Sequence, residues 1–227
     1  GMHEFLVDFM TRHKDQPFYV HYAMSHMHGP ILQTADNKPG SKDLYAENVA
    51  YMDKLVGQLV DELERLKLRE RTFVVFVGDN GTARFGGDRM TIGGRRIAGM
   101  EGTLLEGGSR VPMIVSWPGS TPAGKVSDDL VDFTDFMPTF AELAGARLPE
   151  SVTIDGQSFA ARAQGRPGVA REWAYTELNG KWYVRSARWK LNRAGELFDM
   201  KDAPFVEAPV AATTTDTLAV AARGQRP

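Results

Sequence analysis

The chain has 227 residues, of which 42% are hydrophobic and 25% charged, and this composition is typical of ordinary globular proteins. A net charge of −2 gives no reason to expect a nucleic acid or an anionic membrane as partner. No apolar run approaches the roughly 20 residues that span a bilayer, and no signal peptide is visible. Cysteine is absent, which excludes disulfides, thiolate metal sites and a cysteine nucleophile.

The first 42 residues predict one helix, one strand and one loop. Residues Glu4–His13 carry apolar side chains at helical spacing, which indicates a short amphipathic helix. Pro17 then introduces Phe18–Ala23, an aromatic and β-branched run that predicts a buried strand. The strand continues into a histidine-containing segment, residues 24–30, and residues 31–42 have the turn residues of a loop.

A long helix is predicted from about residue 43 to Lys67, capped by Ser41 or Asp43. Its apolar residues alternate by three and four and form one stripe, which indicates a helix packed on a core rather than a coiled coil of three heptads. Because the helix joins two predicted strands, we expect a βαβ unit, a parallel sheet and a right-handed crossover.

The second strand of that unit is Thr72–Val77, a nearly continuous apolar run that predicts burial on both faces. It ends in the turn Gly78-Asp79-Asn80-Gly81. Open α/β sheets bind ligands beyond the carboxyl ends of their strands, so we place the candidate site at this turn. Residues 82–106 contain six glycines and four arginines without clear periodicity, which predicts a long ordered loop.

Beyond that loop, residues 111–117 predict a third strand and residues 133–144 a helix ended by Gly145. The pattern changes near residue 148. Short strand-like pieces at 172–177, 181–186, 189–192 and 196–198 are joined by Asn179-Gly180 and Ala194-Gly195, and Asn-Gly is a strong hairpin signal. We therefore predict an α/β core over residues 1–147, a small antiparallel sheet over 148–200, and a tail over 201–227 in which 217–223 could form a helix.

The turn after the second strand offers hard oxygen ligands. The Asp79 carboxylate and the Asn80 amide carbonyl suit Ca²⁺ or Mg²⁺, although either ion needs about six oxygens or more. The alternative is an ordinary Asx turn without a ligand. Asn80-Gly81-Thr82 also matches a glycosylation sequence, which we interpret as a chance match.

His26 and His28 follow the first predicted strand. In an extended chain, residues two apart face the same way, so both imidazoles can point at one site. They could contact an anionic substrate and its leaving group, or ligate zinc, or be exposed loop histidines. Farther along, Gly107-Gly108-Ser109-Arg110 suggests a tight backbone passage in which Arg110 pairs with an acid.

The order of these motifs resembles the C-terminal half of the sulfatases, within the alkaline-phosphatase-like superfamily. A Pro-Phe-Tyr-Val-His-Tyr-Ala segment runs into His-x-His-x-Pro, and a long helix follows. Then come Val-Val-Phe-Val-Gly-Asp-Asn-Gly and Glu-Gly-Gly-Ser-Arg-Val-Pro. Trp189-Lys190-Leu191 and Glu196–Met200 are similar to the family's closing hairpin. The resemblance covers roughly residues 4–205.

The resemblance implies a partial sulfatase α/β core and metal-dependent hydrolysis of a sulfate ester. Asp79 and Asn80 would be ligands of Ca²⁺ (or Mg²⁺), which polarises the sulfate. His28 would donate a proton to the leaving oxygen, and His26 would support it. Related phosphodiesterases and phosphonate hydrolases share this metal chemistry. The family resemblance also implies a periplasmic or secreted protein.

Two departures from the family pattern stand out. Glu101 occupies the position of a lysine that neutralises the sulfate, and a carboxylate there would repel it, so Arg95 or Arg96 is a candidate replacement. No segment matches the one whose Cys or Ser becomes the formylglycine nucleophile. We therefore expect a fragment that is inactive alone and that self-associates through unpaired strand edges. The alternative is a non-catalytic partner module that completes a separate N-terminal half.

Overall fold

The computed structural model describes residues 1–84, 86 and 90–211. The chain divides into two compact units, the first comprising residues 1–74 and 116–119 and the second residues 75–115 and 120–227. Each unit is described by itself. The domain boundary predicted near residue 148 does not coincide with the boundaries of these two units, and it stays a prediction. Among the described residues, no helix has the length and apolar character needed to cross a membrane.

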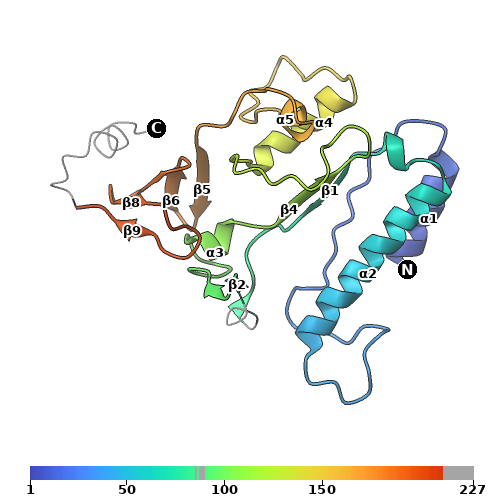
Figure 1. Cartoon of the computed structure of the whole chain (residues 1–227), viewed down its shortest axis with the longest axis horizontal. Helices are drawn as coiled ribbons and strands as arrows, with labels where there is room; N and C mark the ends of the chain where they lie inside the picture. The colour runs from blue at the N-terminus through green and yellow to red at the C-terminus, as the bar shows by residue number, and fades with distance from the viewer. Residues whose placement is uncertain (85, 87–89, 212–227) are drawn as a thin grey trace. The chain divides into compact units, whose positions relative to one another are not determined.

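The first unit is built on the two predicted helices, α1 (Met2–His13) and α2 (Leu44–Arg65), which lie side by side (Figure 1). Asp43 is the N-cap of α2, because its carboxylate accepts the N–H of Ala46 at 3.2 Å. A short 3₁₀ turn, η1 (Arg69–Arg71), follows α2. The core is a small apolar cluster in which the buried residues are Met10, Leu63 and Leu68.

The predicted strand Phe18–Ala23 is wrong. Residues 17–25 form irregular chain in which half-buried and exposed residues alternate from Phe18 to Met24. Phe18 packs against the apolar cluster around Met10, so its side chain contributes to the core of the helical unit rather than to a sheet. A strand needs a neighbouring strand to pair its backbone groups, and an apolar run by itself does not supply one. The expected βαβ unit is therefore not formed in the described chain.

The next two predicted strands exist and pair with each other: β1 (Val74–Val77) and β4 (Met113–Ser116). The Gly78 N–H donates to the Pro112 carbonyl at 3.1 Å and the Gly81 N–H to the Gly108 carbonyl at 3.0 Å. These bonds follow the two segments in opposite chain directions, as in an antiparallel pair. Every residue of β1 is half-buried, so the expected burial on both faces is not reached.

The predicted loop over residues 82–106 contains short regular structure. The strands β2 (Thr91–Ile92) and β3 (Arg95–Arg96) form a hairpin. Its two turn residues, Gly93 and Gly94, have φ of 57° and 77°, the left-handed conformation of a two-residue turn. The short helix α3 (Glu106–Ser109) then leads towards β4. Backbone hydrogen bonds between near neighbours form these pieces, and such bonds leave no periodic hydrophobic signal.

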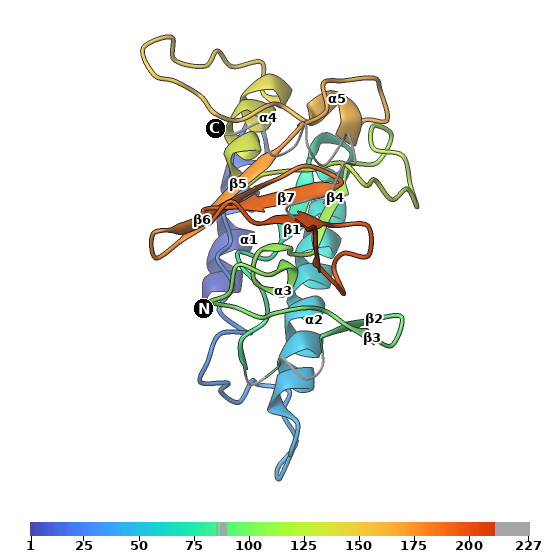
Figure 2. The ribbon, with the colours of Figure 1, turned by 90° about the vertical axis from the view of Figure 1, so that its left-hand side faces the viewer.

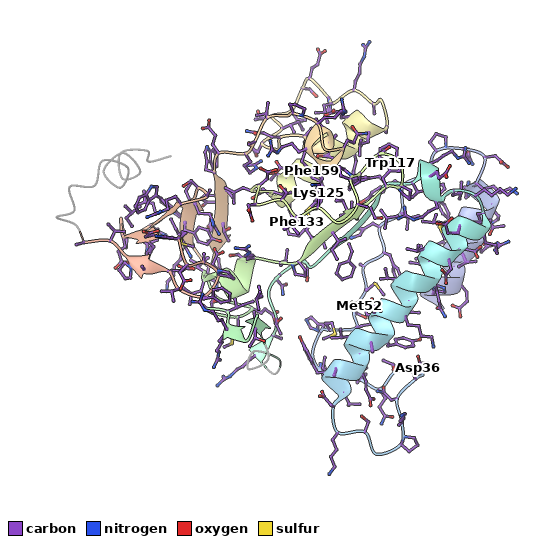
Figure 3. The ribbon with its side chains drawn as sticks, viewed as in Figure 1. Asp36, Met52, Trp117, Lys125, Phe133 and Phe159 are labelled. Carbon is purple, nitrogen blue, oxygen red and sulfur yellow. The ribbon has the colours of Figure 1, made fainter. Side chains whose placement is uncertain are left out.

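The predicted helix near residue 133 consists of the 3₁₀ turn η3 (Phe133–Asp135) and α4 (Phe136–Leu143), and the chain leaves it at Gly145 with φ of 65°. Another short helix, α5 (Ala160–Ala163), follows. The ring of Phe136 meets the rings of Phe133 and Phe159 edge-on, with centroids 5.4 and 5.7 Å away; the latter two are labelled in Figure 3. This aromatic contact joins α4 to the α5 segment.

Asp135 ties the same region together through polar contacts. Its side chain accepts the N–H groups of Asp132 and Gln157 and pairs with the guanidinium of Arg171, and both charged side chains are buried. Burial by itself raises the pKa of Asp135, but the hydrogen bonds from Arg171 and the two N–H groups outweigh it and hold the pKa below its ordinary value. The carboxylate is thus kept charged inside the protein.

The predicted antiparallel sheet is confirmed and has a further strand. Its order is β5 (Ala174–Leu178), β6 (Lys181–Arg185), β7 (Trp189–Asn192), β8 (Leu197–Asp199) and β9 (Ala208–Pro209), and β5, β6 and β7 lie side by side in Figure 2. Asn179 and Gly180 both have positive φ, as the predicted hairpin requires. The chain is thus an α/β protein with a small C-terminal antiparallel sheet. The helix predicted at 217–223 lies outside the described residues.

Candidate functional site

The turn that follows β1 presents its two polar side chains to solvent. Asp79 and Asn80 are both exposed. The Asn80 amide nitrogen donates to the Gly81 carbonyl at 3.0 Å, which orients the side chain and leaves its amide oxygen available. Within the described chain, the Asp79 carboxylate has no hydrogen-bond or ion-pair partner. The turn therefore presents two hard oxygen donors side by side.

Close backbone contact fixes this turn. A Cβ atom on Gly81 would lie 1.7 Å from the Gly107 carbonyl oxygen, so only glycine fits there. Gly107 and Gly108 are equally confined, because Cβ atoms on them would lie 2.6 and 2.1 Å from the carbonyl oxygens of Gly99 and Thr103. The glycines of the predicted tight passage therefore let three backbone segments meet, and the Asp79–Asn80 turn is held on that passage.

The same packing places Glu101 beside the turn. Its N–H donates to the Thr82 carbonyl at 3.0 Å, and Thr82 directly follows the turn residue Gly81. The Glu101 side chain is exposed and has no partner within the described chain. The Glu101 carboxylate, which stands where a lysine was expected, thus lies at the edge of the candidate site. A carboxylate at this position repels an anion that approaches the turn.

Glu106, which directly precedes the tight glycines, is the most deeply buried acid among the described residues, with 1% exposure. Its carboxylate accepts a hydrogen bond from the Arg185 guanidinium of β6 at 2.6 Å, and the Arg110 guanidinium lies 3.6 Å from its second oxygen. The predicted pairing of Arg110 with an acid is therefore confirmed. Through Arg185, the small sheet holds the helix that carries the tight glycines.

A second buried ion pair lies next to the first. The ammonium of Lys190 in β7 contacts the Glu207 carboxylate at 2.7 and 2.9 Å and donates to the Leu104 carbonyl at 2.5 Å, while Glu207 also accepts the Glu106 N–H at 3.0 Å. The Lys190 ammonium lies 4.1 Å from the centre of the Tyr183 ring. The sequence did not predict this pair, since Glu207 lies in the segment that was expected to be a tail.

Tyr183 completes this connection between the sheet and the passage. Burial raises the pKa of its hydroxyl, which stays protonated and lies 2.6 Å from the Ser109 hydroxyl. Ser109 is the last residue of α3. We call Glu106, Arg185, Lys190, Glu207 and Tyr183 the buried polar network. No sequence signal singles it out, because its partners are up to 101 residues apart.

The two arginines proposed as replacements for the missing lysine lie in β3, outside this network. The two terminal guanidinium nitrogens of Arg95 donate to the Asp202 carboxylate, at 2.8 and 2.6 Å, and the guanidinium carbon lies 4.0 Å from the centre of the Phe205 ring. The hydrogen bond that Arg95 donates to the Asp202 carboxylate raises the pKa of Arg95, which therefore stays charged but is engaged. Arg96 follows it on the same exposed hairpin. A substrate role for either arginine stays a prediction.

The predicted histidine pair lies in the first unit. His26 and His28 line the same hollow, a cavity of about 340 Å³ next to α2. The rings of His26 and Tyr51 are 5.4 Å apart, and the Nδ1 atom of His26 is buried without a hydrogen-bond partner. Both histidines thus border one hollow, and a catalytic role for either of them stays a prediction. The Asp79–Asn80 turn belongs to the second unit and is described separately.

The donor set can be compared with what a divalent cation needs. Carboxylate and amide oxygens such as those of Asp79 and Asn80 suit Ca²⁺ and Mg²⁺, and among the described residues no cationic side chain binds either of them. Over the residues that the structure describes, no group of three or more His, Asp or Glu side chains is arranged to hold a metal ion. The turn thus offers two oxygen atoms of the kind that such an ion binds, fewer than the six or more that it needs, and a metal role stays a prediction.

Comparison with known proteins shows which protein family the chain is similar to. A family model described as "Sulfatase" matches residues 2–146, and one described as "N-sulphoglucosamine sulphohydrolase, C-terminal" matches residues 102–205. The chain is 31% identical over 202 residues to arylsulfatase D of Homo sapiens, covering 85% of this chain and 33% of that protein. It is 32% identical over 200 residues to arylsulfatase A of Homo sapiens, covering 83% and 38%.

Two solved structures are also similar to the chain over most of its length. The crystal structure of Ps i-CgsB in complex with k-i-k-neocarrahexaose matches with a TM-score of 0.73 and 28% identity, over 88% of this chain and 48% of that one. PsFucS1 sulfatase from Pseudoalteromonas sp. matches with a TM-score of 0.70 and 25% identity, over 94% and 44%. The chain therefore spans between about a third and a half of the length of these relatives.

Proposed function

The chain belongs to the sulfatase family, and we propose that its residues form one part of a sulfuric ester hydrolase site. The observation that carries the proposal is the Asp79–Asn80 turn, held by Gly81 against the Gly107 backbone, with no partner for either side-chain oxygen donor among the described residues. An ordinary Asx turn does not need such close backbone packing, whereas a ligand site needs its donor atoms held in place.

Asp79 and Asn80 would hold a divalent cation, Ca²⁺ or Mg²⁺, together with ligands outside this pair. The ion would polarise the sulfate group and stabilise its developing negative charge. Asp79 contributes the charge and Asn80 a neutral oxygen, while the Gly81 carbonyl keeps the Asn80 amide turned so that its oxygen is free. The metal identity and the remaining ligands belong to the proposal.

His28 would donate a proton to the leaving oxygen of the ester, and His26 would line the same cavity beside it. An imidazole can exchange a proton near neutral pH, which suits the departure of a poor alkoxide leaving group. Within the described residues, the His28 side chain has no protein partner that would occupy its ring nitrogens. A ligand or water can therefore reach it.

The isolated 227-residue polypeptide should not hydrolyse sulfate esters. The motivation is that no residue in the chain corresponds to the formylglycine nucleophile and that Glu101 lies where the family has a cation. An aryl sulfate incubated with the purified polypeptide should release no phenol above the buffer rate. Release that depends on His28, tested with His28→Ala, would contradict this proposal.

Ca²⁺ binding gives a direct test of the turn. Two protein ligands are too few for tight binding, so calorimetry on the isolated polypeptide should find no micromolar site. When the polypeptide is mixed with an N-terminal sulfatase half that carries the nucleophile, aryl sulfate turnover should appear. The variant Asp79→Asn should abolish that turnover, and Asp128→Asn, which alters an exposed aspartate of the same unit, should not. Equal activity of both variants would refute the metal role.

A second function is a non-catalytic partner module, and the position of Glu101 beside the turn favours it. In that case the polypeptide would bind an N-terminal half, or a second copy of itself, without restoring turnover. Solution scattering separates these states from a monomer.

A related phosphodiesterase or phosphonate hydrolase would instead cleave a phosphate analogue in the mixed sample. We further propose a periplasmic or secreted location for the whole protein.

A further inference from the structure

The sequence contains two Asn-Gly pairs, Asn80-Gly81 and Asn179-Gly180, and the fold places them in opposite surroundings. In an Asn-Gly pair the glycine backbone nitrogen can attack the asparagine side-chain carbon, because glycine has no Cβ atom to hinder the approach. The attack requires the peptide unit between the two residues to rotate. The surrounding structure therefore decides which of the two asparagines can react.

Packing blocks the reaction at Asn80. The Gly81 N–H donates to the Gly108 carbonyl at 3.0 Å, and the Asn80 amide nitrogen donates to the Gly81 carbonyl at 3.0 Å. Gly81 is buried, and a Cβ atom on it would lie only 1.7 Å from the Gly107 carbonyl oxygen, which leaves no room for rotation. The Gly81 nitrogen therefore cannot reach the Asn80 side chain while this packing holds.

The second pair stands at the open tip of the β5–β6 hairpin. Asn179 and Gly180 are both exposed. In the part of the chain that the structure describes, the Gly180 N–H donates no hydrogen bond and the Asn179 side chain has no hydrogen-bond partner. A Cβ atom placed on Gly180 would come no closer than 3.6 Å to another atom, a guanidinium nitrogen of Arg193. Nothing in this packing opposes rotation of the peptide unit.

Arg193 also activates the nitrogen of this pair. Its guanidinium donates a hydrogen bond to the Gly180 carbonyl, and its backbone N–H donates to the Trp182 carbonyl of β6 at 2.9 Å, which anchors the arginine beside the turn. A cation on a carbonyl oxygen draws electron density from the amide and stabilises the anion that forms when the amide nitrogen loses its proton. The Gly180 nitrogen is thus both accessible and made more acidic.

We propose that Asn179 is a site of spontaneous deamidation in the folded protein, promoted by Arg193, whereas Asn80 is protected. The Gly180 nitrogen loses its proton to solvent and forms a bond to the Asn179 Cγ atom, and the Cγ–Nδ2 bond breaks. Nδ2 takes a proton from water and leaves as ammonia, which leaves a cyclic imide. Water then opens the imide: cleavage of the new bond gives aspartate, and cleavage of the original peptide bond gives isoaspartate. The proposal does not depend on the hydrolase role of the Asp79–Asn80 turn.

The product has a structural consequence for the small sheet. Isoaspartate adds one carbon atom to the backbone of a two-residue turn, whose length sets the pairing of Leu178 with Lys181. β5 is the edge strand of the sheet and pairs only with β6 in the described chain. Deamidation should therefore loosen β5, while the protected Asn80 keeps its neutral amide oxygen.

Peptide mass spectrometry after incubation of the 227-residue chain in mildly alkaline buffer tests the proposal. In the folded chain, the Asn80 peptide should deamidate at least about tenfold more slowly than the Asn179 peptide, because the packing around Gly81 must open first. In urea both peptides should react at comparable rates, since the two pairs then differ little. Fragmentation that distinguishes isoaspartate from aspartate identifies the product.

Variants of Arg193 test its role separately. Arg193→Gln removes the charge and should slow deamidation of Asn179 about two- to fivefold in the folded chain, whereas Arg193→Lys should retain most of the rate. Arg188→Gln is the matched control, because Arg188 is an exposed arginine of the same sheet that pairs with Asp199. A substitution that merely loosened the hairpin would raise the rate, so its effect has the opposite sign.

Faster reaction at Asn179 than at Asn80, lost in urea and reduced by Arg193→Gln, supports the proposal. Comparable rates at the two sites in the folded chain would overturn it. So would an Asn179 that stays intact in the folded chain but reacts in urea. An unchanged or higher rate in Arg193→Gln would overturn the activation by Arg193.

Discussion

Replacing Lys190 by methionine tests whether the buried polar network holds the candidate site. The Lys190 and Glu207 side chains are 4% and 5% exposed, and their charged groups lie 2.7 Å apart. Lys190→Met removes the charge, the two bonds to Glu207 and the bond to the Leu104 carbonyl. Methionine retains an unbranched apolar stem, so packing against Tyr183 changes little.

The expected loss of stability follows from what remains behind. Glu207 keeps the Glu106 N–H as a donor, but its carboxylate is left buried without a cation. Removing one partner of a buried ion pair costs about 3–5 kcal/mol, which is a large share of a typical stability of about 5–15 kcal/mol. Neutralising Glu207 as well, in Lys190→Met with Glu207→Gln, should recover about 1–3 kcal/mol, because no charge is then left unpaired.

Urea unfolding followed by tryptophan fluorescence measures these free energies. Arg188→Met is the matched control, because Arg188 pairs with Asp199 at 2.7 Å on the surface of the same sheet, with 48% and 25% exposure. Its loss should stay below about 1 kcal/mol. The reasoning fails if Lys190→Met costs no more than this control, or if the double variant is less stable than Lys190→Met alone.

Three further predictions concern the turn, its neighbouring charge and the response to acid. Gly81→Ala should displace the turn and destabilise the fold by about 1–3 kcal/mol or more. The control Gly57→Ala, in open space on α2, should stabilise the fold by about 1 kcal/mol. Thermal melts compare the stabilities of the two variants. Glu101→Lys should tighten inorganic sulfate binding by about 2- to 30-fold in calorimetry, and the exposed control Glu150→Lys, with the same change in net charge, should not. Because the pKa of Asp135 is lowered in the fold, its contribution to stability is complete above its ordinary value of 3.8 and is lost as the pH falls below it. Urea midpoints should therefore fall less between pH 7 and acid in Asp135→Asn than in the unsubstituted chain, and equal pH dependence would exclude this role.

Local sequence signals predicted the elements that local forces form. The caps and stripe of α2, the left-handed Asn179-Gly180 turn and the Gly145 helix end all appear as expected, because each depends on residues within one or two turns of chain. The same signals failed at Phe18–Ala23, where strand formation depends on a partner strand. The hairpin β2–β3 was missed, because four residues carry no measurable period.

The sequence by itself determined the family pattern, the order of the motifs and the residue types at Asp79, Asn80, His26 and His28. Only the tertiary structure decided how the turn is supported. Gly81 meets Gly107 through backbone atoms, and Lys190 meets Glu207 across the small sheet, so neither contact has a local signature. Side-chain chemistry is encoded residue by residue, whereas burial and pairing arise from segments far apart in the chain, and these decide which groups stay free to bind a ligand.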